Sequence, residues 1–342
     1  MIEFVGPEYS YTGERLTEPE TIFIKDHHYN EELHEFPVKR LLENSTNPHA
    51  HTIVFDHVLQ HDDMLKDYNL VCLPVLMAKY TNQFIQQQII PNWTHKYQTF
   101  NFIINKARLH RTFMLMLLDM FDLHDCEYTL CWKHTDIDKN VMMRETNNIT
   151  YQKIILSSRI TTTPRQYLFG TEKLLDQGLK YGSITNPEVY QRFLQQAVFE
   201  PTCVSLITEP AFFERETIIT EKTIMAIYGG TVPIWVGGWR IADYLRGQGF
   251  DVFDDIVDHS YQDMPDPWDR CYYAIEKNIN LLKDFDTVQK FVYNNKHRLQ
   301  ANLDLLETNT FVINIQQILN RQSTKVKTDL EAKLEWLTCN HK

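Results

Sequence analysis

Long apolar runs and paired cysteines are both missing from the 342-residue chain, and each absence excludes a class of protein. No run reaches the roughly eighteen apolar residues of a membrane-spanning helix, and residues 1–7 show neither the basic nor the long apolar segment of a secretory signal. The six cysteines form no CxxC pair and no zinc-like spacing with histidine, which indicates reduced, mostly buried thiols. We therefore expect a soluble, cytoplasmic protein that has no membrane partner.

Positive charge is also scarce, since the formal net charge at pH 7 is −11. A protein that binds the long phosphate backbone of a nucleic acid usually carries a net basic surface. Duplex DNA is therefore a disfavoured partner, although the net charge leaves room for a local basic channel. Low-complexity tracts and internal repeats are missing too, and apolar residues make up 43% of the chain, so we expect most of it to fold.

The length predicts about two domains, and the spacing of apolar residues predicts their class. Predicted strands occupy residues 2–5, 21–25, 51–55, 69–73, 99–104, 127–132, 154–156, 203–207, 231–236 and 251–253, and predicted helices occupy residues 111–121, 171–181, 221–228 and 241–247. Strand alternating with helix indicates parallel sheets. We expect an α/β fold with two Rossmann-like domains facing a cleft, divided into residues 1–95 and 96–275, with packing helices at 276–342.

The most informative segment is residues 203–238, where a strand, a loop, a helix start and a second strand follow in close succession. Thr220 is a good N-cap, so the first backbone N–H groups of the next helix should point outward with partial positive charge, ready for a diphosphate. Lys222 adds a full charge, and Glu221 can accept hydrogen bonds from ribose hydroxyls. The helix ends at Gly230 and its glycine neighbour.

The tripeptide Thr220-Glu221-Lys222 is weak evidence by itself, because Glu at a helix start complements the helix dipole and Lys commonly faces solvent. Residues 171–173 repeat the same three letters at another predicted helix start. That copy lacks the Gly-Gly-Thr-Val-Pro run, which here occupies residues 229–233. The extended pattern therefore carries the signal.

This extended pattern resembles a known family. The run Ile219-Thr220-Glu221-Lys222, followed by Ala226, Gly230, Val232-Pro233-Ile234 and Gly237, is similar to the signature of the α-1,3-fucosyltransferases and, more loosely, to exostosin-type donor domains. Residues 245–270 resemble glycosyltransferase-like proteins of large-DNA viruses and phages. The resemblance implies a GT-B type glycosyltransferase in which Glu221 and Lys222 hold the ribose and the diphosphate of a nucleoside diphosphate sugar.

Two positions depart from the family pattern. Ile218 stands where the family usually has Tyr, and Glu209-Pro210-Ala211 keeps only the acid of the family's Glu-Asn-Ser. The family resemblance favours a GDP-sugar as the donor. The two departures leave the identity of the sugar open.

Two further basic elements are expected at the same sheet edge. Arg108 and Arg111 lie between a predicted strand and a helix, where they could bind a diphosphate; a solvated helix start is the alternative interpretation. The loop after residue 156 resembles the fucosyltransferase loop whose Arg neutralises the leaving diphosphate, with Arg165 the nearest match and Arg159 its competitor. The predicted nucleotide-sugar site comprises Thr220, Glu221, Lys222, Arg108, Arg111, Arg165, Ser157, Glu209 and Gly230.

An Asp-x-Asp pair could hold a divalent ion against the diphosphate, and two such pairs occur. Asp284 and Asp286 lie in a helical stretch, where carboxylates two residues apart diverge. Asp136 and Asp138 follow a predicted strand and are the contenders for a metal site. Because lysine and arginine already supply positive charge, we expect transfer that requires no metal or other cofactor.

The base that deprotonates the acceptor hydroxyl should come from the N-terminal domain. Asp26 and Asp56 end β-like runs and Glu14 is a third candidate, and the sequence does not decide among them. With Arg165 and Lys222 as the catalytic cations, we expect an inverting hexosyl- or pentosyltransferase that acts on a glycan or another hydroxyl acceptor. Two alternatives stay open: transfer to hydroxymethylated bases of viral DNA, and an inactive sugar-nucleotide-binding or assembly protein.

Overall fold

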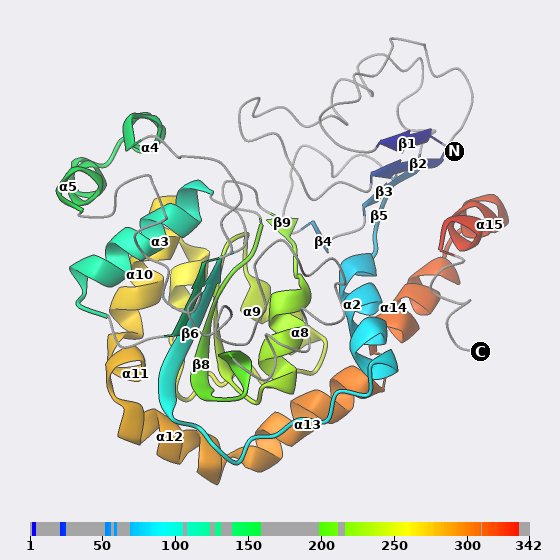
Figure 1. Cartoon of the computed structure of the whole chain (residues 1–342). Helices are drawn as coiled ribbons and strands as arrows, with labels where there is room; N and C mark the ends of the chain where they lie inside the picture. Colours follow the sequence, from blue (N-terminus) through cyan, green and yellow to red (C-terminus); the bar gives the residue numbers. More distant parts are fainter. Residues whose placement is uncertain are drawn as a thin grey trace, which may run out of the picture.

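A computed structural model describes residues 2–4, 21–24, 52–55, 58–59, 69–104, 108–123, 127–130, 139–158, 198–210, 216–308 and 310–334. These residues form a mixed α/β structure with two four-stranded parallel sheets, a two-stranded ribbon and many helices (Figure 1). None of the helices in these ranges combines the length and the apolar character needed to cross a membrane.

The first sheet lies in the N-terminal part of the chain. It consists of β1 (Ile2–Phe4), β2 (Thr21–Ile24), β3 (Thr52–Phe55) and β5 (Asn69–Cys72), hydrogen-bonded in this order and all parallel. Their Ile, Val, Thr and Phe residues favour a pleated, half-buried surface. The four N-terminal strand predictions are thus confirmed.

The second sheet consists of β6 (Gln98–Ile104), β7 (Glu127–Leu130), β8 (Thr202–Thr208) and β10 (Val232–Val236), all parallel in the order β10-β8-β6-β7. β8 and β10 are buried over their whole length, which explains their largely apolar sequences. The chain runs from β6 outward to β7 and then returns to the other side of β6 as β8, so the strand order reverses between β6 and β8. At such a reversal ligands bind in a crevice at the carboxyl ends of the strands.

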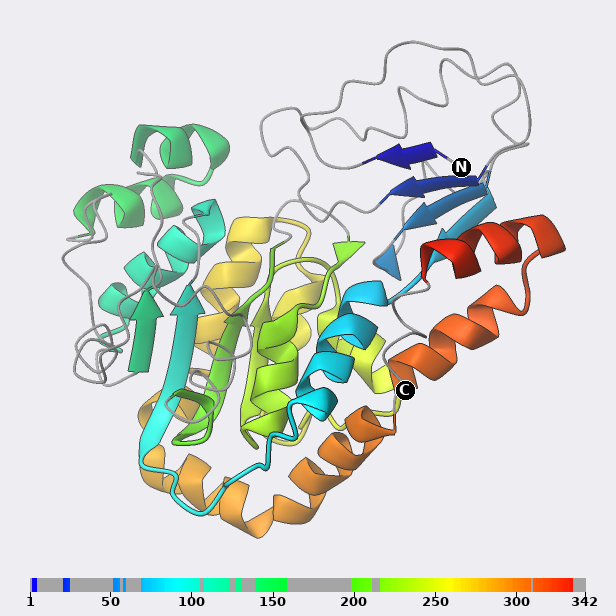
Figure 2. The same cartoon turned by 45° about the vertical axis from the view of Figure 1, so that its right-hand side comes forward.

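Helices cover both faces of the second sheet (Figures 1 and 2). On one side, α3 (Leu109–Met120) contacts α10 (Pro267–Lys277), and the rings of Phe113 and Trp268 meet edge to face with centroids 4.9 Å apart. On the other side, α8 (Glu221–Tyr228) packs against α2 (Val75–Gln86). α11 (Ile279–Lys283) and α12 (Phe285–Asn294) contact β6, and α12 also contacts β8.

The remaining elements extend from this centre. α13 (Lys296–Glu307) and α14 (Thr310–Leu319) contact α2, and α15 (Thr324–Lys333) ends near the first sheet in both views (Figures 1 and 2). Four short elements complete the described chain: α4 (Lys139–Glu145), α5 (Ile149–Ser157), α9 (Ile241–Gly247) and the 3-10 helix η4 (Ser260–Asp263). The ribbon pairs β4 (Val58–Leu59) with β9 (Glu216–Thr217), and so joins the N-terminal part to the segment that precedes α8.

Two strand predictions are wrong. Residues 154–156 belong to helix α5, whose buried residues Tyr151, Ile154 and Ile155 have the spacing of one helix face. Residues 251–253 form no strand, because Phe253 has a positive φ of 62° and Asp251 is bound side-on by the guanidinium of Arg298. The predicted helix at 171–181 lies outside the described residues.

α2 is not among the predicted elements, although it has 12 residues. Its buried face includes Thr81 and Asn82, and these polar residues interrupt the apolar pattern from which a helix is predicted. α2 precedes the expected domain division at residue 95 and packs against α8 and α14. Beyond residue 276 the described chain is helical, as predicted.

Candidate functional site

The start of α3 holds the chain where it leaves β8, through three successive backbone carbonyls. The bonds run from Arg111 Nη2 to Thr208 O at 3.2 Å, from His110 Nε2 to Glu209 O at 2.9 Å and from Arg108 Nη1 to Pro210 O at 2.9 Å. Because α3 follows β6 and β8 is the neighbour of β6, these contacts lie at the strand reversal. The structure thus brings both predicted arginines to this edge, where they bind carbonyls of the protein itself.

The carboxylate of Glu209 is bound to the start of α8. Its Oε1 accepts hydrogen bonds from the Thr220 backbone N–H at 3.0 Å and from Thr223 Oγ1 at 2.9 Å, and its Oε2 accepts from Thr220 Oγ1 at 2.6 Å. Trp235 Nε1 donates to Thr223 Oγ1 at 3.0 Å. The backbone N–H of Glu209 donates to the carbonyl of Val236 at 2.8 Å. Glu209 therefore ties the end of β8 to both α8 and β10.

Thr220 occupies the N-cap position of α8, as the sequence predicts, with an extended backbone at φ −114° and ψ −174°. Its side chain makes no capping hydrogen bond within the described part of the chain, because the hydroxyl donates to Glu209 instead. The backbone N–H of Thr223 reaches the Thr220 carbonyl at 3.2 Å. The Thr220 hydroxyl therefore does not cover the N–H groups of the first turn of α8, of which the N–H of Glu221 donates to its own carboxylate.

Lys222 brings a buried positive charge to this helix start. Its side chain is 7% exposed, and its Nζ lies 3.7 Å from Glu221 Oε1 and 3.5 Å from Thr220 Oγ1. Burial lowers the pKa of Lys222; the carboxylates of Glu221 and Glu209 raise it, and the charges of Arg111 and Arg108 lower it. Lys222 is therefore a buried cation among charges of both signs.

The two acids of the cluster differ in their surroundings. Burial raises the pKa of Glu209, which is completely buried, although Lys222 and the hydrogen bonds from Thr220 oppose this effect. Burial also favours the neutral form of Glu221, but the charge of Lys222, a hydrogen bond from the backbone N–H of Glu221 itself, the charge of Arg111 and a hydrogen bond from Thr220 together hold the pKa of Glu221 below its ordinary value. The side chain of Glu221 is 26% exposed, so it is the more accessible of the two carboxylates.

His110 is the neutral residue of the cluster that also contains Arg108, Arg111, Lys222, Glu209 and Glu221. Burial, followed by the charges of Arg111 and Arg108, holds the pKa of His110 well below its ordinary value. Since the carbonyl of Glu209 can only accept, the neutral ring carries its proton on Nε2. His110 therefore acts as a donor that fixes the β8 end without adding charge.

Three cations, Arg108, Arg111 and Lys222, thus share the strand reversal with two carboxylates, Glu209 and Glu221. The chain matches no protein-family model, no curated protein and no solved structure. The three cations, and a helix start that the Thr220 hydroxyl leaves uncovered, both suit an anion, and above all one with several oxygens such as a diphosphate.

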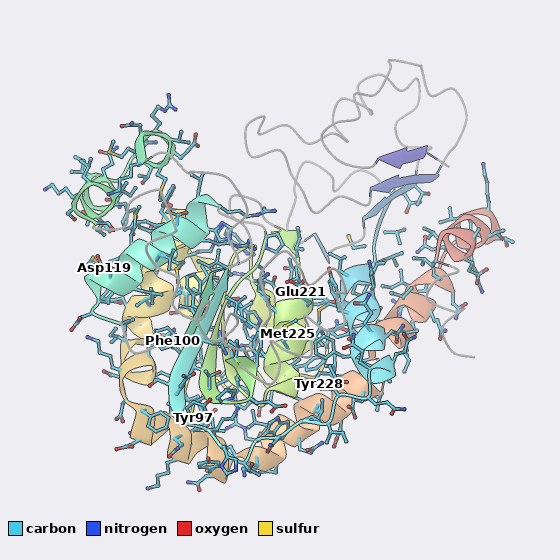
Figure 3. All side chains as sticks on the ribbon, in the orientation of Figure 1. Tyr97, Phe100, Asp119, Glu221, Met225 and Tyr228 are labelled. Carbon is cyan, nitrogen blue, oxygen red and sulfur yellow. The ribbon has the colours of Figure 1, made fainter. Side chains whose placement is uncertain are left out.

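Two predicted site residues lie apart from this cluster. Gly230 follows the C-terminal end of α8 with a φ of +58°, and a Cβ there would come within 2.6 Å of the Trp93 ring. Figure 3 shows Glu221 and Tyr228 at opposite ends of α8, so Gly230 lies at the end away from Lys222. Ser157 is the last residue of α5, and its hydroxyl donates to the Ile154 carbonyl at 3.3 Å. In the structure, Gly230 follows the end of helix α8 and Ser157 bonds to a carbonyl of its own helix.

Other predicted residues lie outside the described ranges, and their roles stay predictions: Arg165 and its competitor Arg159, the candidate bases Asp26, Asp56 and Glu14, and the metal contenders Asp136 and Asp138. Within the described ranges, no three His, Cys, Asp or Glu side chains come together as a metal site requires.

Three residues of the cluster are not among the predicted site residues. His110 lies between the two predicted arginines, and Thr223 stands three residues after the N-cap, where a side chain commonly reaches back over the helix start. Those two positions could have been found from the sequence. Trp235 could not, because only the fold brings its indole N–H to Thr223.

Proposed function

We propose that the protein transfers a sugar from a nucleoside diphosphate sugar, with a GDP-sugar favoured, to a hydroxyl acceptor. The observation that carries the proposal is the juxtaposition of Arg108, Arg111 and Lys222 at the reversal between β6 and β8, beside the start of α8. Fixed cations and a helix N-terminus at this point of a parallel sheet suit a diphosphate. The similarity of the Thr220-Glu221-Lys222 segment to fucosyltransferases supports the same ligand, and with it two Rossmann-like domains of GT-B type.

In this proposal Lys222 and the first turn of α8 bind the diphosphate, and Glu221 binds the ribose. Without a ligand, Glu221 Oε1 lies 3.7 Å from Lys222 Nζ and serves as its partner. A diphosphate replaces the carboxylate as the partner of Lys222. The partly exposed Glu221 then accepts hydrogen bonds from ribose hydroxyls, which an acidic side chain does in other nucleotide sites.

The same cations support the chemical step. As the bond between sugar and diphosphate breaks, negative charge grows on the departing diphosphate. Lys222, Arg108 and Arg111 are held in place by the protein, so they stabilise this charge without rearranging. We propose inversion at the sugar carbon without a metal, with Asp26 or Asp56 as the base and Arg165 as a further cation.

A binding protein without transferase activity is the second candidate. The contacts of Arg108 and Arg111 with the carbonyls of Pro210 and Thr208 favour it, because they also fit arginines whose role is to hold the loop after β8. Such a protein binds the nucleotide sugar but neither transfers nor hydrolyses it.

Calorimetric titration with GDP, UDP and ADP tests the proposal. We expect one of the three to bind with an enthalpy that disappears in Lys222→Ala; a protein that binds none of them contradicts the proposal. Donor hydrolysis then separates the two candidates. Hydrolysis that Lys222→Ala abolishes supports the transferase, whereas binding without any turnover supports the binding protein.

A further inference from the structure

We infer that Glu209 keeps the anion site at α8 open by holding the hydroxyl of Thr220 away from the first turn of the helix. Glu209 is thus a positioning residue, which acts on the ligand through Thr220 and the N–H groups of α8. This inference rests on the proposed function, because it concerns how the same site receives its diphosphate.

Thr220 has the conformation of a capping residue in every respect except its side chain. Its backbone has the extended angles of an N-cap residue, and threonine at an N-cap ordinarily turns its oxygen onto the N–H groups of the first turn. Only the direction of the side chain departs from that arrangement. Rotation about one side-chain bond would therefore bring the Thr220 hydroxyl onto the helix start and cover the groups that an anion requires.

A strong hydrogen bond to Glu209 prevents this rotation. Thr220 Oγ1 donates to Glu209 Oε2 at 2.6 Å, a short hydrogen bond to a carboxylate in a completely buried position. Bonds to a charged acceptor are roughly twice as strong as neutral ones. The Glu209 carboxylate therefore outcompetes the backbone N–H groups for the Thr220 side chain.

Glu209 is itself held in place at both its backbone and its carboxylate. Its backbone is held between β10 and α3, through the Val236 carbonyl at 2.8 Å and the ring of His110 at 2.9 Å. Its second carboxylate oxygen accepts from Thr223, which is itself fixed by the Trp235 indole. A carboxylate held at this many points does not swing toward a ligand, which fits positioning better than direct contact with the donor.

Removal of the Glu209 carboxylate separates this inference from simple electrostatics. Glu209→Ala deletes a negative charge beside Lys222, so electrostatics alone predicts tighter binding of an anion. The inference predicts weaker binding, because the released Thr220 hydroxyl caps the helix and must be displaced. We expect about fivefold weaker binding, the fold-change that corresponds to one N-cap hydrogen bond.

The rescue variant makes the test specific. In Glu209→Ala with Thr220→Val, the valine cannot cap the helix, so binding should be restored relative to Glu209→Ala alone. A merely structural role for Glu209 predicts no such rescue. Glu209→Leu keeps a similar volume but offers no partner to the Thr220 hydroxyl, and serves as the second variant, with the same expected result, if Glu209→Ala does not fold.

The experiment is a calorimetric titration of the full chain and its variants with inorganic pyrophosphate, after circular dichroism has shown that each variant is folded. Weaker binding by the Glu209 variant, restored by Thr220→Val, supports the inference. Tighter binding by the Glu209 variant, or weaker binding without rescue, overturns it and leaves the proposed function standing. A wild-type protein that binds neither pyrophosphate nor any nucleoside diphosphate overturns both.

Discussion

Nζ of Lys96 donates a 2.5 Å hydrogen bond to the backbone carbonyl of Gly229, at the end of α8 opposite the candidate site. Trp93 Nε1 donates to the neighbouring carbonyl of Tyr228 at 2.7 Å. Both donors belong to the segment between α2 and β6. The helix that carries Lys222 is therefore held at its C-terminal end by this segment and at its N-terminal end by Glu209.

The buried lysine predicts a pH dependence of stability. Burial lowers the pKa of Lys96 from 10.5 to about 7, partly opposed by the charges of Cys203 and Glu200. Between these two values the folded protein has lost the proton and the unfolded chain keeps it, so the free energy of unfolding rises with pH by up to about 1.4 kcal/mol per unit.

Urea unfolding at pH 7 and pH 9 checks this prediction. Between these pH values the free energy of unfolding of the wild type should rise by about 2 kcal/mol more than that of Lys96→Met, because the variant has no proton to lose at this position. Lys290→Met removes an exposed lysine of α12 and should keep the wild-type rise. Equal rises in the wild type and Lys96→Met would show that Lys96 does not titrate in this range.

Gly230 predicts a local stability effect. Gly230→Ala places a methyl group 2.6 Å from the Trp93 ring in a backbone with a φ of +58°, so it should lower the free energy of unfolding by about 2 kcal/mol or more. Gly247→Ala is the matched control, because a Cβ at this helical position meets no described atom within 4 Å. It should stabilise the protein by about 0.5 kcal/mol. Thermal unfolding of both variants measures the contrast, and similar effects would contradict the packing of Trp93.

His110 predicts a sensitivity to acid. The folded protein holds it neutral, since burial and two arginines lower its pKa, whereas the unfolded chain takes up a proton below the ordinary value of 6.5. The free energy of unfolding therefore falls as the pH drops below that value, by up to about 1.4 kcal/mol per unit. His110→Gln keeps an N–H donor but does not titrate, so it should lose less stability between pH 7 and pH 5 than the wild type does.

His297→Gln, at an exposed position of α13, is the control for this comparison and should behave as the wild type does. If the wild type and His110→Gln lose the same free energy of unfolding between pH 7 and pH 5, then His110 is not held neutral by its surroundings.

Regular features of the second sheet could be predicted from the sequence. The predicted bounds of α8 and α9 match the structure, because an N-cap residue or a glycine marks their ends. The proximity of Arg108 and Arg111 to Lys222 also followed from a simple rule, that segments after neighbouring parallel strands meet at one sheet edge.

Features that depend on side-chain direction could not be predicted. Residues 154–156 are a short apolar run, and such runs do not distinguish a strand from one turn of a helix. The sequence places Glu209 near α8, but only the fold shows that its carboxylate binds Thr220. For Gly230, the helix end was predicted and the Trp93 ring that requires a glycine was not.

The central claim is that Lys222 lies in a site for the diphosphate of a nucleotide. Its most direct test compares the wild type, Lys222→Met and Lys153→Met in calorimetric titrations with whichever of GDP, UDP or ADP binds. Lys153→Met removes the same charge from an exposed position of α5. We predict that Lys222→Met weakens binding at least tenfold, as expected for the loss of a charged hydrogen bond, and that Lys153→Met binds as the wild type does. Equal affinities in Lys222→Met and the wild type would contradict the claim.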